Sequence, residues 1–442
     1  MKKAGLLMLG VVLGSLLLIV PLAQAQVNIR WIFPGTADVE RDYAQQITEA
    51  FNQTHPEVKL DVEFIGWGEI MDKITIMVLA DNPPDIMWGS IRRLKDLQSM
   101  GALISIEKWL KDYQELDKFY PYLLEGLTMD GELYSLPTMN ELKTTGGQMR
   151  VNKIRKFWGP ECLINTWDDY LSVAEACQKQ DYDGDGKIDT YGIFISAQQF
   201  MPLEDQLESF ARNNGPLLLT QLLDRTKKRQ WVETIEYLQK LSEYSMPGNL
   251  SMVFTDRTRA FAEERVVIVP GSGSWVFGNQ WTVKPEGLTE EKLGRIIGPV
   301  GPSHEGPPVA VSTPYGPFIF KDIPEDHQEA AWKFVKFQAN RENAARFPGI
   351  MHVPSRTDVS LDDVMKFTPY PPEQYKWYVR MWVRIAPHAI TRVMPPGWGE
   401  MTQIAATAML DLYRREATAE ETYEKIYTDV KNVWDARGYK PE

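Results

Sequence analysis

The chain has 442 residues, of which 43% are hydrophobic and 24% are charged, and its formal net charge is −12. This composition is typical of a globular protein, and the length exceeds the ~250–300 residues at which one hydrophobic core stops growing. We therefore expect two domains. The acidic balance speaks against a nucleic-acid partner, because nucleic acids require a clustered basic surface.

The beginning of the chain has the pattern of a cleavable secretory signal. Two lysines precede an apolar run over residues 4–23, and Ala23-Gln24-Ala25 forms a small-x-small cleavage site. We expect residues 1–25 to be removed after Ala25; a retained membrane anchor is the alternative. No cysteine that could carry a lipid follows the run, and no other stretch reaches the ~18 apolar residues of a membrane span.

The next segment alternates strand-like and helical patterns. Apolar residues predict strands at 28–33, 59–64 and 85–88, and helices over 39–55 and 70–79. This β-α-β-α-β order is typical of a parallel sheet with helices on its faces, hence of the α/β fold class. Ligands of such sheets bind beyond the carboxyl ends of the strands.

A capping-box pattern starting at Thr166 predicts the beginning of a helix. Apolar residues at helical spacing place Cys177 on the core-facing side of this helix. Cys162, the only other cysteine, lies just upstream. In an oxidising compartment the two could form a disulfide, and a buried free thiol is the alternative.

The segment after this helix has the spacing of a calcium-binding loop. Acidic side chains occupy positions 1, 3, 5 and 9, glycine occupies position 6, and position 7 offers a backbone carbonyl. The expected ligands are Asp181, Asp183, Asp185, Lys187 and Asp189. Position 12 is Gly192 instead of glutamate, and a strand-like pattern follows where an EF-hand has its second helix. We expect a structural calcium site; a polar turn is the alternative.

The remaining elements are expected after residue 187. Strands are expected at 188–196, 265–270 and 310–320, and a Gly/Pro-rich crossing loop at 296–308. The helices expected here are 229–244, 255–264, 326–347, 372–385, 400–415 and 419–436.

Aromatic residues indicate what the protein binds. Several of the 14 tryptophans follow glycine or lie in predicted loops. Aromatic rings stack on the apolar faces of sugars. Carboxylates accept hydrogen bonds from the hydroxyls, and amides both accept and donate them. The ligand-binding residues that we expect are Asp38, Trp67, Glu69, Trp88, Ser90, Asn140, Glu141, Trp275, Tyr315 and Trp398.

Common catalytic motifs are absent from the sequence. It contains no His-Glu-x-x-His, no Gly-x-Ser-x-Gly and no Walker loop. The carboxylate pair of a glycosidase is defined in space and not by spacing along the chain. The sequence therefore gives no positive evidence for an enzyme.

Six short segments also carry a family resemblance. They are 84–86 (P-D-I), 130–137 (D-G-E-L-Y-S-L-P), 166–169 (T-W-D-D), 260–275 (A-F-A to G-S-W), 330–337 (A-A-W-K-F-V-K-F) and 354–356 (P-S-R). Together they resemble the family 1 extracellular solute-binding proteins of ABC importers, the group that includes maltose- and glycerol-phosphate-binding proteins. The usual Tyr-Asn-Lys strand of that family is here Arg150-Val-Asn-Lys153, which lacks the aromatic residue.

The resemblance implies two α/β lobes joined by a hinge that closes on the ligand. Lobe 1 would contain residues 26–138 and 310–356, and lobe 2 residues 139–309 and 357–442. It also implies a membrane permease as partner. Ligand-contacting residues vary across the family, so the resemblance does not identify the ligand; we expect a carbohydrate or polyol, and we expect a monomer. A receptor without an anchor is retained only inside an outer membrane, so we expect a periplasmic location.

Three other functions stay open from the sequence. A phosphate ester could be the ligand, with Arg392 or Arg150 binding the phosphate, because a fork-shaped guanidinium suits that group. The protein could be an extracellular carbohydrate-active enzyme. It could also be a calcium-stabilised adhesion or scaffold protein.

Overall fold

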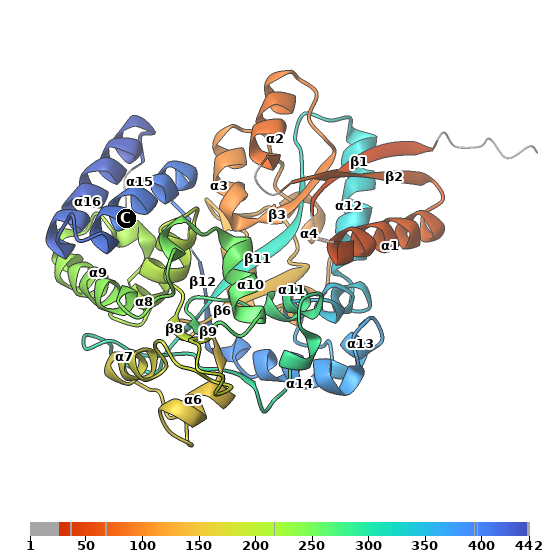
Figure 1. Cartoon of the computed structure of the whole chain (residues 1–442). Helices are drawn as coiled ribbons and strands as arrows, with labels where there is room; N and C mark the ends of the chain where they lie inside the picture. Colours follow the sequence, from red (N-terminus) through yellow and green to blue (C-terminus); the bar gives the residue numbers. More distant parts are fainter. Residues whose placement is uncertain are drawn as a thin grey trace, which may run out of the picture.

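A computed structural model describes residues 26–35, 38–66, 69–215, 217–392, 394–395 and 397–439 (Figure 1). The expected signal at 1–25 and the expected ligand residue Trp67 lie outside these ranges. Among the described helices, none combines the length and the apolar character that crossing a bilayer requires.

The first sheet confirms the predicted β-α-β-α-β order. Strands β1 (Val27–Pro34), β2 (Val58–Ile65) and β3 (Ile86–Ser90) alternate with helices α1 (Asp38–Thr54) and α2 (Ile70–Leu79). β1 pairs in parallel with β2 on one side and with β3 on the other. The carboxyl ends of the three strands therefore lie at one edge of the sheet.

A helix from the second half of the chain completes the core of this sheet. α12 (Glu325–Ala339) packs beside α1, and Phe334 of α12 contacts both Trp31 of β1 and Phe51 of α1, with ring centroids 4.8 and 5.2 Å apart. The prediction of one helix over 326–347 is wrong at its carboxyl end. Asn340 is extended there, and its Oδ1 atom accepts the N–H of Asn343 at 2.8 Å. Only short 3₁₀ turns follow.

Strand β11 (Ala310–Ile319) joins the first sheet to the rest of the molecule. Its second half pairs antiparallel with β3, and its first half pairs antiparallel with β6 (Met139–Lys143) and in parallel with β12 (Ala389–Thr391). The chain continues from β6 into β7 (Gln148–Arg150), which belongs to the second sheet. The predicted crossing loop at 296–308 contains no helix and no strand of its own.

The second sheet has the strand order β10-β7-β9-β8. Its other strands are β8 (Tyr191–Ile193), β9 (Val266–Val269) and β10 (Leu293–Arg295). The expected strand at 188–196 is thus shorter than predicted, because residues up to 190 belong to the preceding loop and hairpin-like bridge.

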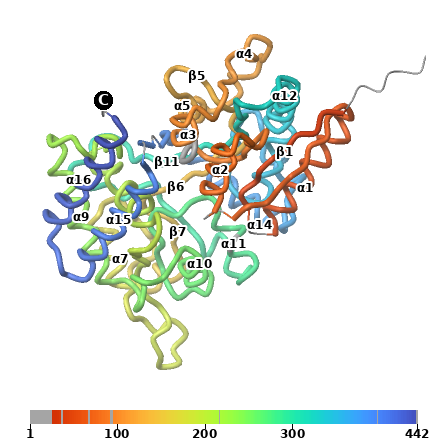
Figure 2. The backbone as a smooth tube through the Cα atoms, turned by 90° about the horizontal axis from the view of Figure 1, so that it is seen from above, coloured from red at the N-terminus to blue at the C-terminus, as the bar shows by residue number. Residues whose placement is uncertain are grey.

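Eight further helices follow in this part of the chain, and in Figure 2 α7, α9, α15 and α16 lie on the side of the molecule away from β1 and α1. The eight are α6 (Val151–Phe157), α7 (Trp167–Ala176), α9 (Lys228–Ser242), α10 (Phe254–Ala262), α11 (Val276–Trp281), α14 (Pro372–Val383), α15 (Trp398–Tyr413) and α16 (Ala419–Ala436). The sequence predicted α9, α10, α14, α15 and α16 to within a few residues, and α7 begins with the predicted capping box at Thr166.

The hydrophobic core consists of two clusters. One extends from the first sheet to α10, α11 and α14, and the other combines α7, α9, α15 and α16. The first cluster continues across the lobe boundaries expected from the sequence, so the division into 26–138 with 310–356 and 139–309 with 357–442 stays a prediction.

The two cysteines are free thiols in this structure. Cys177 is fully buried at the end of α7, where burial raises the pKa of its thiol to about 12. Cys162 is half-buried, and its pKa is raised for the same reason. The free-thiol alternative therefore describes Cys177 in this structure.

Candidate ligand-binding site

Three helices begin at the edge where β1, β2 and β3 end. Asp38 is the first residue of α1, Glu69 is the N-cap of α2, and Ser90 is the N-cap of α3 (Ile91–Ser99). The free N–H groups of a helix N-terminus give this edge a partial positive charge that suits polar ligand oxygens. Asp38 and Glu69 are exposed, whereas Ser90 is buried.

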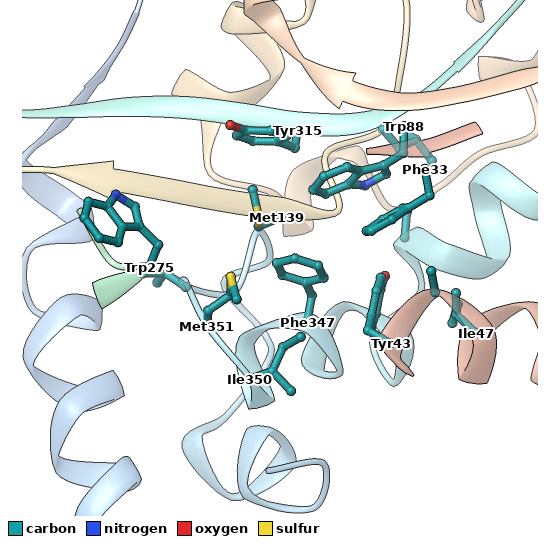
Figure 3. Close-up of a cluster of buried hydrophobic side chains, with 14 of the residues drawn as sticks. Phe33, Tyr43, Ile47, Trp88, Met139, Trp275, Tyr315, Phe347, Ile350 and Met351 are labelled. Carbon is teal, nitrogen blue, oxygen red and sulfur yellow. The ribbon is translucent and has the colours of Figure 1, made fainter. Parts of the chain in front are cut away.

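Trp88 lies in an aromatic stack beside this edge (Figure 3). Phe33 and Tyr315 both stack on it, each with ring centroids 4.9 Å apart and planes inclined by 28°. The indole N–H donates to Thr138 Oγ1 at 3.0 Å. Because 1% of Trp88 is exposed, its ring belongs to the core in this structure and has no free face for a sugar.

The other predicted residues of β6 and β11 lie next to this stack. The Tyr315 hydroxyl donates to Glu141 Oε2 at 3.0 Å. Asn140 Nδ2 donates to the Tyr122 hydroxyl at 2.7 Å, and Asn140 Oδ1 accepts from Ser312 Oγ at 2.9 Å. All of these polar groups are paired with protein atoms, which fixes their orientation.

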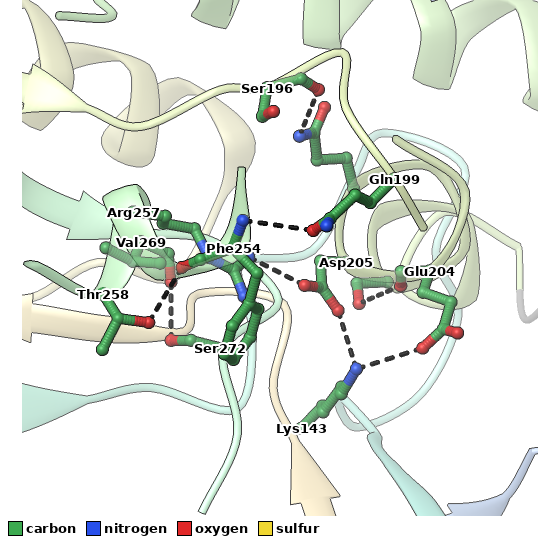
Figure 4. A network of polar contacts seen from close by, with 12 residues as sticks. Lys143, Ser196, Gln199, Glu204, Asp205, Phe254, Arg257, Thr258, Val269 and Ser272 are labelled. Atoms are coloured by element: carbon green, nitrogen blue, oxygen red, sulfur yellow. Dashed lines mark hydrogen bonds and ion pairs between the residues drawn. The ribbon is translucent and has the colours of Figure 1, made fainter. Parts of the chain in front are cut away.

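A run of alternating buried charges joins these strands to helical segments of the rest of the chain. We call it the charge chain; its members, in order, are Arg257, Asp205, Lys143, Glu204, Arg392, Glu208 and Arg212. The successive nitrogen-to-oxygen distances are 2.7, 2.8, 3.2, 2.5, 2.8 and 3.4 Å. Figure 4 shows the end that contains Arg257, Asp205, Lys143 and Glu204. The side chains are at most 2% exposed, so each charge depends on its neighbours for compensation.

The charge chain links four segments that are distant in sequence. Lys143 is the last residue of β6, Arg392 follows β12, and Arg257 lies on α10. The three carboxylates belong to one π-helical turn, η2 (Pro202–Glu208), and Arg212 ends the helix that follows it. π-Helical turns are rare and occur frequently at functional sites. Of the charge chain, sequence reasoning named only Arg392, as a phosphate ligand; four polar residues among the seven of η2 were the only local signal for the rest.

A glycine lets η2 approach the second sheet. Gly271 has φ +62, and a Cβ atom at this position would lie 1.8 Å from the carbonyl oxygen of Asp205. Any side chain would therefore push η2 away from the end of β9. The placement of Asp205 depends on this close contact.

Trp275 lies at the Arg257 end of the charge chain. Its ring centroid is 4.7 Å from that of Phe254 and 5.4 Å from Cζ of Arg257. In Figure 3, Met139 and Met351 lie between Trp275 and the Trp88 stack. Lys143 also lies 3.8 Å from Glu141, so the charge chain connects Trp275 with Tyr315. We call Glu141, Lys143, Asp205, Arg257, Trp275 and Tyr315 together the junction site.

Other predicted residues lie elsewhere or already have partners. Trp398 opens α15 and belongs to the second core cluster. Arg150 donates to the carbonyl oxygens of Phe261 and Gly287 at 2.6 and 2.7 Å, and burial lowers its pKa to about 10. Arg392 is bound to two carboxylates of the charge chain. Neither guanidinium is arranged to receive a phosphate.

The predicted calcium loop gathers three of its four carboxylates. Oxygens of Asp181, Asp183 and Asp189 lie within 4.8 Å of one another. Asp181 accepts the N–H groups of Gly184 and Gly186 at 2.6 and 2.8 Å, and these hydrogen bonds lower its pKa.

Asp185 does not belong to this cluster of three carboxylates. It accepts the backbone N–H of Lys187 at 2.9 Å and its ammonium group at 3.0 Å. The remaining oxygen set fits a hard cation.

Comparison with known proteins identifies the family. The chain matches the bacterial extracellular solute-binding protein family over residues 37–345, and it belongs to that family. Solved structures share its two-lobed α/β fold at low identity.

Two of these structures cover nearly the whole chain. The ABC transporter solute-binding protein of Thermotoga lettingae, bound with α-D-tagatose, is 18% identical with a TM-score of 0.73, over 92% of this chain and 100% of its own. Maltose-bound MalE3 of T. maritima is 16% identical with a TM-score of 0.71 over the same shares.

Curated relatives match over a shorter stretch. The polygalacturonan/rhamnogalacturonan-binding protein YtcQ of Bacillus subtilis is 29% identical over 143 residues, 30% of this chain and 27% of its own length. The lipoprotein LipO of the same species is 28% identical over 148 residues, 32% of this chain and 28% of its own. The matches thus span under a third of these relatives.

Proposed function

We propose that the protein captures a carbohydrate, either a sugar, an oligosaccharide or a polyol, between its two lobes and delivers it to the permease of an ABC transporter. The observation that carries this proposal is the junction site. There, the rings of Tyr315 and Trp275 lie beside buried carboxylates and cations of β6, η2 and α10. Rings for sugar faces and charged hydrogen-bonding groups for hydroxyls are the two components of a carbohydrate site. Tyr315 and Trp275 are 5% and 6% exposed in this structure, so a sugar would reach these rings only after the lobes separate.

The names of similar proteins support this class of ligand. Structural neighbours are described in complex with tagatose, maltose and ribitol, and a curated relative is described as binding polygalacturonan. These ligands share hydroxyl groups and differ in size and charge. The ligand class proposed for this chain, a carbohydrate or polyol, is the class that these ligands share.

Binding would be coupled to lobe closure through the crossing segments. The chain passes from β6 of the first sheet to β7 of the second, and Lys143 of β6 and Arg392 after β12 bind carboxylates of η2. A ligand that contacts both lobes only in the closed form shifts the population toward that form. The closed form would then dock on the permease.

The remaining expectations belong to the same proposal. The receptor is exported by the signal at 1–25, acts in the periplasm as a monomer, and releases its ligand unchanged. An enzyme would instead convert the bound carbohydrate.

Calorimetry and melting curves with a carbohydrate panel test the proposal. The panel contains neutral sugars, polyols, uronides and phosphate esters. We expect at least one sugar or polyol to bind and to raise the melting temperature by mass action, with the ligand recovered intact by chromatography. Binding of none of them, or recovery of cleaved product, would contradict the proposal.

We also propose that the loop 181–189 binds calcium as a structural cation. The support is its three converging carboxylates. Calcium should raise the melting temperature and a chelator should lower it, since the ion binds only the folded loop. Asp183→Asn should abolish this difference, whereas Asp61→Asn on the exposed face of β2 should keep it. Equal melting with calcium and with chelator would refute the calcium site.

A further inference from the structure

Arg257 at the end of the charge chain has a free hydrogen-bonding edge. It is 2% exposed, and its Nη1 atom donates to Asp205 Oδ2 at 2.7 Å. Its Nε and Nη2 atoms have no acceptor among the residues that the structure describes. Buried donors without partners are rare in folded proteins, because each costs about 1–3 kcal/mol of desolvation.

The free edge has a specific geometry. Nε–H and one N–H of Nη2 lie in the guanidinium plane and point in the same direction. This pair is one of the two forks that bind both oxygens of a carboxylate. Arg212, at the opposite end of the charge chain, lacks partners at Nε and Nη1 instead. Those two nitrogens do not form such a fork.

The surroundings of Arg257 leave part of its charge uncompensated. Its one carboxylate partner, Asp205, is shared with Lys143, which lies 2.8 Å away. The rings of Phe254 and Trp275 lie 5.0 and 5.4 Å from Cζ and provide apolar surface. An anionic group attached to a ring with an apolar face fits this combination.

We infer that Arg257 binds the carboxylate of a uronic acid unit, so that the solute is an acidic sugar or oligosaccharide. The sugar ring would lie against Trp275, and the carboxylate would accept two hydrogen bonds from Nε and Nη2. This inference rests on the proposed function and narrows its ligand class. A phosphate ester is also an anion, and the experiment below distinguishes it from a uronic acid as the ligand.

Wild-type protein gives the first test, without any substitution. Calorimetry compares digalacturonate with its dimethyl ester and with neutral galactobiose, and includes glycerol phosphate. Two charge-assisted hydrogen bonds correspond to roughly ten- to a hundred-fold in affinity, so digalacturonate should bind that much more tightly than the ester.

Substitutions then assign the preference to Arg257. Arg257→Lys keeps the charge and loses the fork, and should lower digalacturonate affinity at least about ten-fold while the ester binds as before. Arg259→Gln, on the exposed side of the same helix, is the matched control and should bind both as wild type does. Melting curves verify that each variant is folded.

The outcomes separate the two proposals. Equal binding of digalacturonate and neutral sugars, or tighter binding of glycerol phosphate, overturns the uronate inference and leaves solute binding intact. Binding of no carbohydrate overturns both. An unchanged preference in folded Arg257→Lys also overturns the role of this residue.

Discussion

The Trp88 stack and the charge chain are both buried, yet they hold the molecule together in different ways. The stack lies within the first sheet, where Phe33, Trp88 and Tyr315 come from adjacent strands β1, β3 and β11. The charge chain joins β6 and the segment after β12 to η2 and α10. Apolar burial tolerates small displacements, whereas a buried ion depends on the position of its partner. The side of the junction site next to the Trp88 stack should therefore tolerate small displacements, whereas the side formed by the charge chain should not.

The largest effect is expected where the backbone itself approaches the charge chain. Gly271→Ala should lower the free energy of unfolding by about 3 kcal/mol or more, because the new methyl group collides with the Asp205 carbonyl. Urea unfolding measures it. Gly248→Ala is the matched control: its φ is +79, but its nearest neighbour would be Met252 Cε at 3.6 Å. It should cost only about 1 kcal/mol, and equal costs would contradict the close approach.

Removing a charge should cost nearly as much. Asp205→Asn leaves Lys143 and Arg257 without their shared carboxylate, and we expect a loss of about 3 kcal/mol in urea unfolding. The exposed Asp61, 3.2 Å from Lys59, is the control. Asp61→Asn should change stability by under about 0.5 kcal/mol. Similar small losses for both would show that the charge chain contributes no more than a surface pair.

The aromatic stack should respond less to a comparable change. Trp88→Phe keeps a ring between its neighbours and loses the hydrogen bond to Thr138. We expect a loss of about 1–2 kcal/mol in the same unfolding experiment. A loss greater than that of Asp205→Asn would reverse the proposed contrast between the two regions.

The smallest effect concerns alkaline pH. Burial raises the pKa of the Cys177 thiol to about 12 in the folded state, whereas an unfolded thiol has its ordinary pKa of 9.0. The contribution of the protonated Cys177 thiol to the free energy of unfolding is full below pH 9 and is lost as the pH rises from 9 toward 12. Unfolding at pH 8 and pH 10.5 should show a steeper decline for the wild type than for Cys177→Ala. Parallel declines would contradict this burial.

The sequence predicted the parts of the molecule that depend on local pattern. The parallel strands and their helices follow from apolar periodicity. Tyr315, Glu141 and Trp275 come together in the structure, and their contact with a ligand stays a prediction. Trp88 was expected to stack on a sugar. The strand order instead places β11 beside β3, so Tyr315 covers that ring.

The charge chain could not be predicted because its partners meet only in the folded protein. Lys143 and Glu204 are 61 residues apart, and Glu204 and Arg392 are 188 apart. A π-helical turn also lacks the 3.6-residue periodicity on which helix prediction depends. The polar residues of η2 therefore resembled an exposed segment.

A crystal structure of the protein with digalacturonate tests the central claim most directly. The account predicts the sugar between the two lobes, with one ring on Trp275 and a carboxylate on Nε and Nη2 of Arg257. A sugar bound instead in a surface hollow, such as the one lined by Pro285, Gln374 and Trp377, with the junction site free of ligand, would contradict it.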